Sequence, residues 1–387
     1  MQLKPIKQSF QVQYDYQLYF TSGLFESENR LFVNLISDFK PNEAVKLLFV
    51  LDDGVEYHHP NLKAQIFAYC KLNSDHLVHT DTFTIPGGEQ AKNSDADIEL
   101  VLKGVNDNKI CRHSFVVVIG GGAVIDMVGY AAAIAHRGVK LIRIPTTVLS
   151  QNDSAVGVKN SVNAFKKKNF LGTFAPPYAI INDSDFLETL EQRDWISGIA
   201  EAIKVALIKD KVFFQFIADN ATALKNREME PMQYLIHRCA EMHMHHIAQG
   251  GDPFESGSSR PLDFGHWAAH KMEFMTNYSL RHGEAVAKGI ALDVTYAQLL
   301  DLITESELHH ILEVMHEIGF DLQIPFDSAG EINSLLNGIE EFREHLGGRL
   351  TITLINGLGV KHDVHTIDLE IMKQAIEKLN HHFTITN

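Results

Sequence analysis

Apolar runs and helical spacing alternate along the first half of the chain. Residues 46–51, 115–119 and 140–144 are short, nearly continuous apolar runs, each followed by acidic residues, glycines or a proline. Between them, residues 95–105 and 123–135 place apolar side chains at helical spacing. Strands that alternate with helices are typical of a parallel, doubly wound sheet. The first half is therefore predicted to be an α/β domain.

The pattern changes after about residue 185. Helices are predicted over residues 195–208, 232–247, 267–274, 284–300, 306–318 and 369–379, with one strand over 349–355. A turn that ends in Pro176 and Pro177 follows a basic segment and is the predicted boundary. We therefore predict an α/β domain with a parallel sheet over residues 1–177 and a mainly α-helical domain over residues 178–387.

Composition narrows the class of protein. The 387 residues are 45% hydrophobic and 21% charged, which is enough to bury two cores. A formal net charge of −15 argues against nucleic-acid and membrane partners, and an anionic substrate would need a local basic pocket. The chain has three cysteines without a Cys-x-x-Cys pair, no signal-peptide core and no apolar run of membrane-spanning length. A cytoplasmic location is therefore expected.

Two glycine-rich turns are candidates for binding a phosphate. The glycines at 120–122 follow a predicted strand and open a helix, where backbone N–H groups and the helix dipole favour an anion. Asp126 lies one turn into that helix. The pattern is not G-x-G-x-x-G, so a plain tight turn remains the alternative. By itself the second turn, Pro-Gly-Gly with Glu89 and Lys92, is better explained as a surface turn.

Polar side chains gather after the third predicted strand. They are Thr146, Thr147, Asp153, Lys159, Asn160, Asn163, Lys168 and Asn169. Hydroxyl, amide and ammonium groups at the mouth of an α/β sheet suit a phosphorylated ligand. At least one of the lysines at 166–168 is expected to belong only to a solvated loop.

A second group of residues suits a metal ion. Glu201 and Lys204 share one face of an apolar helix, so we expect a buried pair. His266 and His270 stand at positions i and i+4, and His282 opens the next helix. Glu201, His266 and His282 would form a three-ligand zinc site with an open fourth position. Since the chain has 21 histidines, a structural role is the alternative. Surface positions are expected for His243, His245 and His246.

The order of the motifs resembles that of a known family. Eight motifs lie between residues 46 and 359: PGGE-x-x-K, GGG-x-x-x-D, RG-V, PTT, the Asp–Lys–Asn stretch, AE-x-x-K, FGH-x-x-x-H and HGEAV. In this order and near these spacings they resemble 3-dehydroquinate synthase and the wider sugar-phosphate cyclases. Each motif is modest alone, and the specificity comes from the order of all eight.

The resemblance implies a role for each matching residue. NAD would be held by Asp52, Glu89, Lys92, Gly120, Gly121, Gly122, Asp126, Thr146, Thr147, Lys159, Lys168 and Thr189. Zinc, for which Co2+ could substitute, would be held by Glu201, His266 and His282. The catalytic residues would be Asp153, Lys159, Lys204, Arg260 and His270. The substrate would be held by Asp263, Lys168, Asn169, Arg343 and Arg137. Arg137 would reach the partner subunit's phosphate pocket, which implies a homodimer.

The resemblance also implies a reaction. Enzymes of this type are lyases that oxidise a ring hydroxyl of a phosphorylated keto-sugar with NAD, eliminate phosphate, reduce the ketone again and close a carbocycle by aldol addition. NAD ends the cycle as NAD, so there is no net oxidation.

Four departures bear on the substrate. Asp263 stands where dehydroquinate synthases carry an amide, the family's lysine is missing near residues 242–246, a double-lysine motif is reduced to Arg343, and Asn160-Ser161 replaces the Thr–Gly after the substrate lysine. These changes weaken a pocket for a substrate with both a carboxylate and a phosphate. They favour sedoheptulose 7-phosphate, the substrate of the valiolone-synthase branch, although Arg260 and His270 keep dehydroquinate synthase character.

Three other functions stay open. One is a true 3-dehydroquinate synthase of the shikimate pathway, and another is a net NAD-dependent metal alcohol dehydrogenase with the same domain plan. The third is a catalytically silent binding module. The Glu201–Lys204 pair argues against the dehydrogenase, and the complete set of zinc ligands argues against the silent module.

Overall fold

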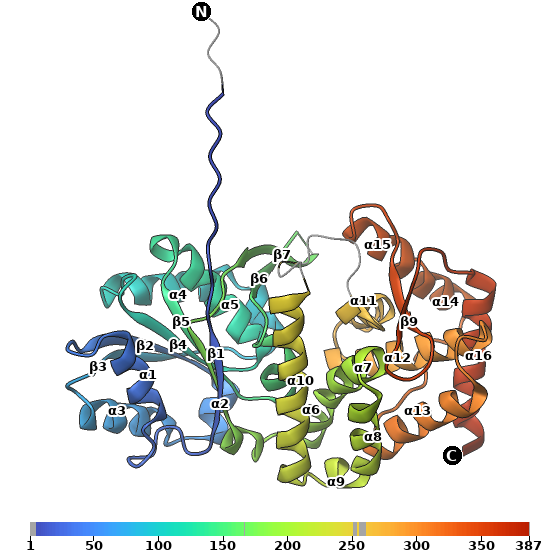
Figure 1. Cartoon of the computed structure of the whole chain (residues 1–387), viewed down its shortest axis with the longest axis horizontal. Coiled ribbons are helices and arrows are strands. Elements are labelled where there is room, and N and C mark those ends of the chain that lie inside the picture. Colours follow the sequence, from blue (N-terminus) through green and yellow to red (C-terminus); the bar gives the residue numbers. More distant parts are fainter. Residues whose placement is uncertain (1–4, 166, 251–253, 255–260, 387) are drawn as a thin grey trace, which may run out of the picture.

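The computed structural model describes residues 5–165, 167–250, 254 and 261–386. Figure 1 shows two halves, an α/β half coloured blue to green and a helical half coloured yellow-green to red. Helix α10 (Met229–Gln249) stands between them. The predicted combination of a parallel-sheet domain with a mainly helical domain is confirmed.

A six-stranded parallel sheet forms the first half, with the strand order β1-β8-β5-β4-β2-β3. Its strands are β1 (Gln17–Thr21), β2 (Val45–Asp52), β3 (Leu77–Ile85), β4 (Phe115–Gly120), β5 (Lys140–Pro145) and β8 (Ala179–Asp183). The apolar runs at 46–51, 115–119 and 140–144 lie in β2, β4 and β5, as predicted. Because helices cover both faces of these strands, nearly every position is apolar instead of every second one.

Five helices cover the sheet: α1 (Leu31–Phe39), α2 (Asp53–His58), α3 (Leu62–Leu72), α4 (Asp95–Asp107) and α5 (Gly122–Ile134). Successive side chains of β2 point to opposite faces. Leu47 and Phe49 pack in one core with α1 and α3. Leu48 and Val50 pack in the other core with α4 and α5. Short helical turns lie in the connections: η1 (Glu89–Asn93), η2 (Ala135–Arg137), η3 (Ser150–Ser154) and η4 (Ser184–Leu187).

A separate antiparallel ribbon consists of β6 (Lys159–Ala164) and β7 (Lys167–Phe174). Its first strand, β6, packs on α5, and Val162 of β6 joins the same core as α5. This ribbon comes after β5 in the chain, so it lies close to the carboxyl ends of the sheet strands. The polar residues that follow the third predicted strand are therefore carried largely by the ribbon.

The second half is helical. Its helices are α6 (Gln192–Ser197), α7 (Ile199–Lys209), α8 (Lys211–Asp219), α9 (Ala221–Lys225), α10, α11 (His266–Met275), α12 (His282–Leu299), α13 (Glu305–Ile318), α14 (Ala329–Leu336), α15 (Gly338–His345) and α16 (Leu369–Thr386). A turn, η5 (Pro261–Asp263), and a short ribbon, β9 (Ile352–Ile355) with β10 (Lys361–Val364), complete it. The helix predicted over 195–208 is split at Gly198, where a Cβ would lie 2.3 Å from the backbone nitrogen of Leu149.

The boundary predicted after residue 177 comes before β8. That strand pairs with β1 and β5, so it belongs to the sheet. The Pro176–Pro177 turn only joins β7 to β8. We therefore propose that the division between the halves lies after η4, where α6 begins. Within the described ranges, no helix combines the length and the apolar character that crossing a bilayer requires.

Candidate active site

Glu201 lies at the centre of the candidate metal site. It is fully buried on α7, whose other buried residues are apolar except for Lys204. Its Oε1 atom lies 3.6 Å from Nε2 of His266 and 3.4 Å from Nε2 of His282. The two imidazoles come from the first residues of α11 and α12. The structure therefore brings together the three residues predicted from the sequence to bind zinc.

Both imidazoles are held in a fixed orientation. Nδ1 of His266 donates to the carbonyl oxygen of Phe264 at 3.0 Å, and Nδ1 of His282 donates to Oε2 of Glu273 at 3.2 Å. With the proton on Nδ1, each Nε2 would offer its lone pair to a metal ion bound beside Glu201. Such outer partners commonly orient metal-binding histidines.

The donor set fits a divalent cation. Within the described part of the chain, Oε1 of Glu201 is buried and accepts no hydrogen bond. One ligand atom each from Glu201, His266 and His282 lies within 4.8 Å of the other two. One carboxylate and two neutral imidazoles are the ligand types that zinc prefers, and a fourth position stays open for a substrate oxygen.

A second possible metal group shares His282. It consists of His270, Glu273 and His282. Glu273, however, already forms an ion pair with Nζ of Lys168 at 2.8 Å and accepts from His282. Although burial opposes ionisation, His282 and Lys168 hold the pKa of Glu273 well below its ordinary value. We therefore interpret Glu273 as the group that orients His282 and Lys168, with His270 exposed beside the cluster.

Lys204 is a buried cation among carboxylates. Its Nζ forms an ion pair with Oε2 of Glu201, and the side chain is only 2% exposed. Burial lowers the pKa of Lys204, but Glu201, Asp153 and then Asp263 raise it above its ordinary value. Lys204 is therefore protonated and supplies positive charge to this part of the site. Asp153 in turn lies 2.8 Å from Nδ1 of His243.

The three glycines lie where a dinucleotide would approach the sheet. Gly120 ends β4 and Gly122 opens α5, and Oδ2 of Asp52 accepts from the backbone N–H of Gly121 at 3.4 Å. A Cβ at Gly120 would lie 2.9 Å from Cβ of Asp52, and one at Gly122 would lie 2.4 Å from Oγ of Ser154. The turn is therefore closely packed and leaves its amides at the N-terminus of α5, which suits a pyrophosphate.

The second glycine turn is part of the same site, which corrects the surface turn expected from its sequence alone. Lys92 of η1 is only 5% exposed. Its Nζ pairs with Oδ2 of Asp126 at 2.6 Å and donates to Oδ1 of Asn169. Glu89 accepts from Asn163 at 3.2 Å and lies 3.9 Å from Lys168. The network joins η1, α5 and β7.

The remaining residues predicted to hold NAD are more scattered. The backbone N–H of Thr146 donates to Gly120 at 3.1 Å, and Thr147 shares a hydrogen bond with Ser150 at 2.8 Å. Thr189 bonds to His59 at 2.9 Å, beside the helix that follows Asp52. Lys159 is exposed at the start of β6. Of these residues, Thr146 and Thr147 directly follow the carboxyl end of β5.

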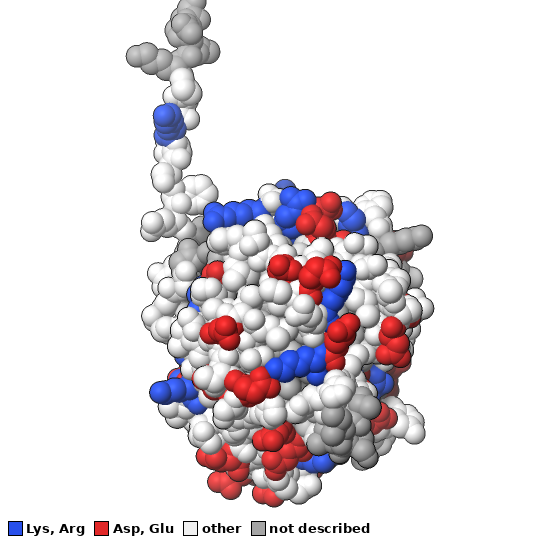
Figure 2. All heavy atoms as spheres, turned by 90° about the vertical axis from the view of Figure 1, so that its right-hand side faces the viewer, with Lys and Arg blue, Asp and Glu red and all other residues white. Residues whose placement is uncertain are grey.

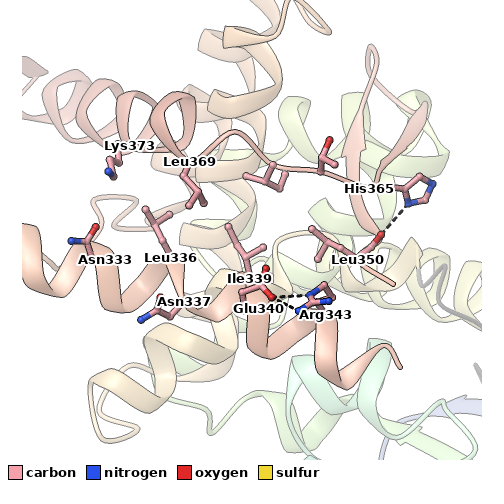
Figure 3. A pocket seen from close by; sticks show the side chains of 12 residues that line it. Asn333, Leu336, Asn337, Ile339, Glu340, Arg343, Leu350, His365, Leu369 and Lys373 are labelled. Carbon is pink, nitrogen blue, oxygen red and sulfur yellow. Dashed lines mark hydrogen bonds and ion pairs between the residues drawn. The ribbon is translucent and has the colours of Figure 1, made fainter. Parts of the chain in front are cut away.

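Two predicted substrate residues are not brought to this cluster by any contact of the described residues. Arg137 is exposed at the end of η2. Arg343 pairs with Glu340 at 2.7 Å and lines a separate pocket of about 440 Å3 between α14, α15 and α16 (Figure 3). The neighbouring Glu341, on another face of α15, pairs with Lys271 of α11 instead. Arg260 lies outside the described residues.

Sequence reasoning missed two members of the site. Glu273 follows His266 and His270 at positions i, i+4 and i+7 of one helical face, so its spacing could have revealed it. His243 was expected at the surface, yet it is half-buried against Asp153. No local pattern distinguishes it from the exposed His245 two residues later.

Known proteins are similar to this chain in sequence and in fold. The family model for the 3-dehydroquinate synthase N-terminal domain matches residues 82–197, and the model for the C-terminal domain matches residues 198–341. The 3-dehydroquinate synthase of Shewanella sp. (strain MR-4) is 36% identical over 276 residues, which are 71% of this chain and 76% of that one. The chain belongs to the 3-dehydroquinate synthase family. A second family member, the 3-dehydroquinate synthase of Shewanella frigidimarina (strain NCIMB 400), is 33% identical over 76% of this chain and 82% of its own.

Solved structures of the 3-dehydroquinate synthase fold extend the comparison. ValA, a 2-epi-5-epi-valiolone synthase from Streptomyces hygroscopicus subsp. jinggangensis 5008 with NAD+ and Zn2+ bound, has a TM-score of 0.87 at 26% identity, covering 97% of this chain and 100% of its own. A 2-deoxy-scyllo-inosose synthase complexed with carbaglucose-6-phosphate, NAD+ and Co2+ has a TM-score of 0.76 at 21% identity, covering 93% and 96% of the two chains. The latter likeness concerns the fold alone.

Proposed function

We propose that this protein is an NAD- and zinc-dependent sugar-phosphate cyclase that prefers sedoheptulose 7-phosphate. The proposed reaction oxidises a ring hydroxyl transiently, eliminates phosphate, returns the hydride and closes a carbocycle by aldol addition. The membership of the family and the NAD+ and Zn2+ bound to the valiolone synthase of similar structure support the reaction type. The charge of the pocket supports the substrate.

The observation that carries the substrate preference is the balance of charge around Lys204. This lysine is surrounded by Glu201, Asp153 and Asp263, and Lys168 is paired with Glu273. Arg343 pairs with Glu340 and lines a different pocket. Carboxylates therefore already neutralise the positive charge of Lys204 and Lys168. A second anionic group on the substrate would be repelled by the negative charge of Asp263. A hydroxymethyl group at that end could instead donate a hydrogen bond to Asp263.

The residues divide the chemistry among themselves. When bound, zinc would polarise the reacting hydroxyl and its ketone, and NAD would accept and return the hydride. Lys204 would place fixed positive charge beside the developing oxyanion. Lys168 and Asn169 would hold the phosphate, and the exposed His270 could carry a proton at the mouth of the cluster. Glu201, His266 and His282 would hold the zinc, and the carbonyl oxygen of Phe264 and the buried Glu273 would keep the two histidines in orientation.

A closed NAD cycle distinguishes this proposal from a net dehydrogenase. We expect the purified protein to release inorganic phosphate from sedoheptulose 7-phosphate while NADH absorbance stays flat. A sugar oxidised once and reduced once leaves no net NADH. NADH formed in proportion to substrate consumed would place the protein among the dehydrogenases instead.

Asp263→Asn tests the substrate preference. We expect wild-type kcat/KM to be higher for sedoheptulose 7-phosphate than for the acidic 3-dehydroquinate synthase substrate. The variant should narrow this ratio by about ten- to a hundredfold, which corresponds to one opposed charge pair of about 1–3 kcal/mol in a partly buried site. Asp301→Asn, at an exposed position, is the matched control. A wild-type enzyme that uses only the acidic substrate would refute the preference.

A true 3-dehydroquinate synthase is the second candidate function. The observation that favours it is the naming of both curated relatives, at 36% and 33% identity, as 3-dehydroquinate synthase. The same pair of substrates decides between the two candidates, because the proposed zinc and NAD chemistry is common to both.

A further inference from the structure

The chain before β1 forms an extended arm. Residues 5–16 contain no helix or strand and project from the body in Figures 1 and 2. From residue 10 to residue 20 every even position is apolar or aromatic: Phe10, Val12, Tyr14, Tyr16, Leu18 and Phe20. The odd positions are mostly polar, namely Gln11, Gln13, Asp15, Gln17 and Tyr19. A period of two over this length indicates a β-strand with one covered face.

Among the residues that the structure describes, only the last part of this alternating segment has a strand partner. Residues 17–21 form β1 and pair with β8, whereas the arm pairs with no strand of the described chain. The apolar side chains of the arm are largely exposed: 91% for Ile6, 87% for Phe10 and 62% for Val12. An unpaired strand with a contiguous apolar face is a template for pairing with another chain.

A complementary edge lies on the β6–β7 ribbon. Among the described residues, β7 pairs with β6 along one edge, and no strand follows on the other. Apolar side chains are exposed along it: 49% for Phe170, 43% for Leu171 and 52% for Phe174. Phe165, in the turn before β7, is 80% exposed. Within the part of the chain that the structure describes, both the arm and this edge therefore combine backbone that pairs with no strand and exposed apolar side chains.

We propose that the arm of one chain adds as a strand to the outer edge of β7 in a second copy of this chain. Among the described residues, each copy offers one arm and one β7 edge without a strand partner, so two exchanges about a two-fold axis pair both features and close the assembly. The first ten described residues span about 33 Å when extended, which exceeds the length of the eight-residue β7. A second copy of this chain would therefore cover both the apolar face of the arm and the outer edge of β7.

The pairing would also steady the candidate active site. β7 carries Lys168 and Asn169, which contact Glu273 and Lys92. A strand added along the outer edge of β7 restrains its backbone and therefore the direction of these two side chains. This catalytic consequence rests on the proposed function, whereas the pairing itself does not.

Sedimentation of an arm variant tests the pairing. We expect Phe10→Ser with Val12→Ser to raise the dissociation constant of the dimer at least about tenfold, because two apolar side chains lose their cover. The control is Gln11→Ser with Gln13→Ser, which changes the opposite face of the same arm and should dimerise like the wild type. A monomeric wild-type protein, or an arm variant that dimerises as tightly as its control, overturns the proposal.

Disulfide trapping tests the edge. In a Cys111→Ser background, which removes the exposed cysteine, Val12→Cys or Tyr14→Cys is mixed with differently tagged Leu171→Cys chains. Crosslinks between the two tags are expected, and Gln13→Cys, on the opposite face, should crosslink less. Crosslinks between two arms without any to residue 171 would show that the arm pairs elsewhere. Because neither measurement uses turnover, failure here leaves the proposed enzymatic function untouched.

Discussion

The surroundings of Glu201 favour a bound cation. Removing a carboxylate from water costs several kcal/mol unless nearby groups compensate its charge. Lys204 compensates one oxygen, but the other lies 3.6 and 3.4 Å from two imidazole nitrogens, which is too long for strong hydrogen bonds. A cation among these atoms would satisfy all of them at once. Without one, Glu273 and Glu201 raise the pKa of His282 to about 10 although burial opposes it, so a proton takes that role.

Zinc content should depend on these residues. We expect Glu201→Ala and His266→Ala to lower the zinc bound per subunit by more than about tenfold, because each removes a direct ligand from a three-ligand site. The measurement is metal analysis after dialysis against a weak chelator, with circular dichroism to verify the fold. The exposed His245→Ala should retain full zinc. Full zinc in both ligand variants would reject the assignment.

At the scale of the element, α11 and α12 behave as one unit. Asp293 of α12 is fully buried and accepts from the backbone N–H of Gly265 at 3.1 Å and from Nε1 of Trp267 at 2.9 Å. These residues flank His266, so α12 positions both its own ligand and the start of α11. The helices pack so closely that a Cβ at Gly289 would lie 2.0 Å from the carbonyl oxygen of Gly265. The separation of the two imidazoles is therefore fixed by backbone contact.

Asp183 links β8 to the loop after β1 and should make stability depend on pH. It accepts from the N–H groups of Leu24 at 2.8 Å and Asp185 at 3.0 Å, and burial raises its pKa from 3.8 to about 6. Because the folded state holds this proton more tightly, the contribution is full below about pH 4 and is lost as pH rises through about 6. Relative to Asp183→Asn, the wild type should lose about 3 kcal/mol of unfolding free energy over that window.

Urea unfolding at a series of pH values measures this difference. Any hydrogen bond lost in Asp183→Asn shifts the two curves by a constant, whereas the titration changes their separation. Asp75→Asn, at an exposed position, is the control. The difference in unfolding free energy between the wild type and this variant should not show the same change with pH. A constant separation between the wild type and Asp183→Asn from pH 4 to 7 would contradict the expected shift.

Local patterns predicted the elements well because a continuous apolar run or a helical period is set by neighbours in sequence. β2, β4 and β5 follow from such patterns, as do the helices α11 and α12, which begin with the predicted metal ligands His266 and His282. The orientation of Glu273 toward Lys168 joins residues 105 positions apart, and nothing local encodes it. For the same reason no local pattern shows that β8 pairs with β5 in the sheet, or that Arg343 lines a pocket between α14, α15 and α16.

At the scale of the whole molecule, the net negative charge opposes the binding of an anionic substrate. The net charge is −15, and Figure 2 shows acidic and basic side chains interspersed over the helical half. A phosphorylated sugar is therefore attracted only by local cations. Lys204 and Lys168 are already paired with carboxylates, so added positive charge from a second subunit would favour phosphate binding.

Arg137 is the residue that we expect to supply this charge. It is exposed, and it follows His136 in a turn where both residues have positive φ, 51° and 63°. Such conformations are costly for non-glycine residues and often mark functional sites.

Subunit complementation tests this role of Arg137. Arg137→Ala and Glu201→Ala should each be inactive alone as homodimers. After subunit exchange, a hybrid contains one intact site, built from Glu201 of one chain and Arg137 of the other. An equal mixture is half hybrids, so about a quarter of wild-type activity should return. If subunit exchange is demonstrated and no activity returns, Arg137 does not act in the active site of the partner subunit.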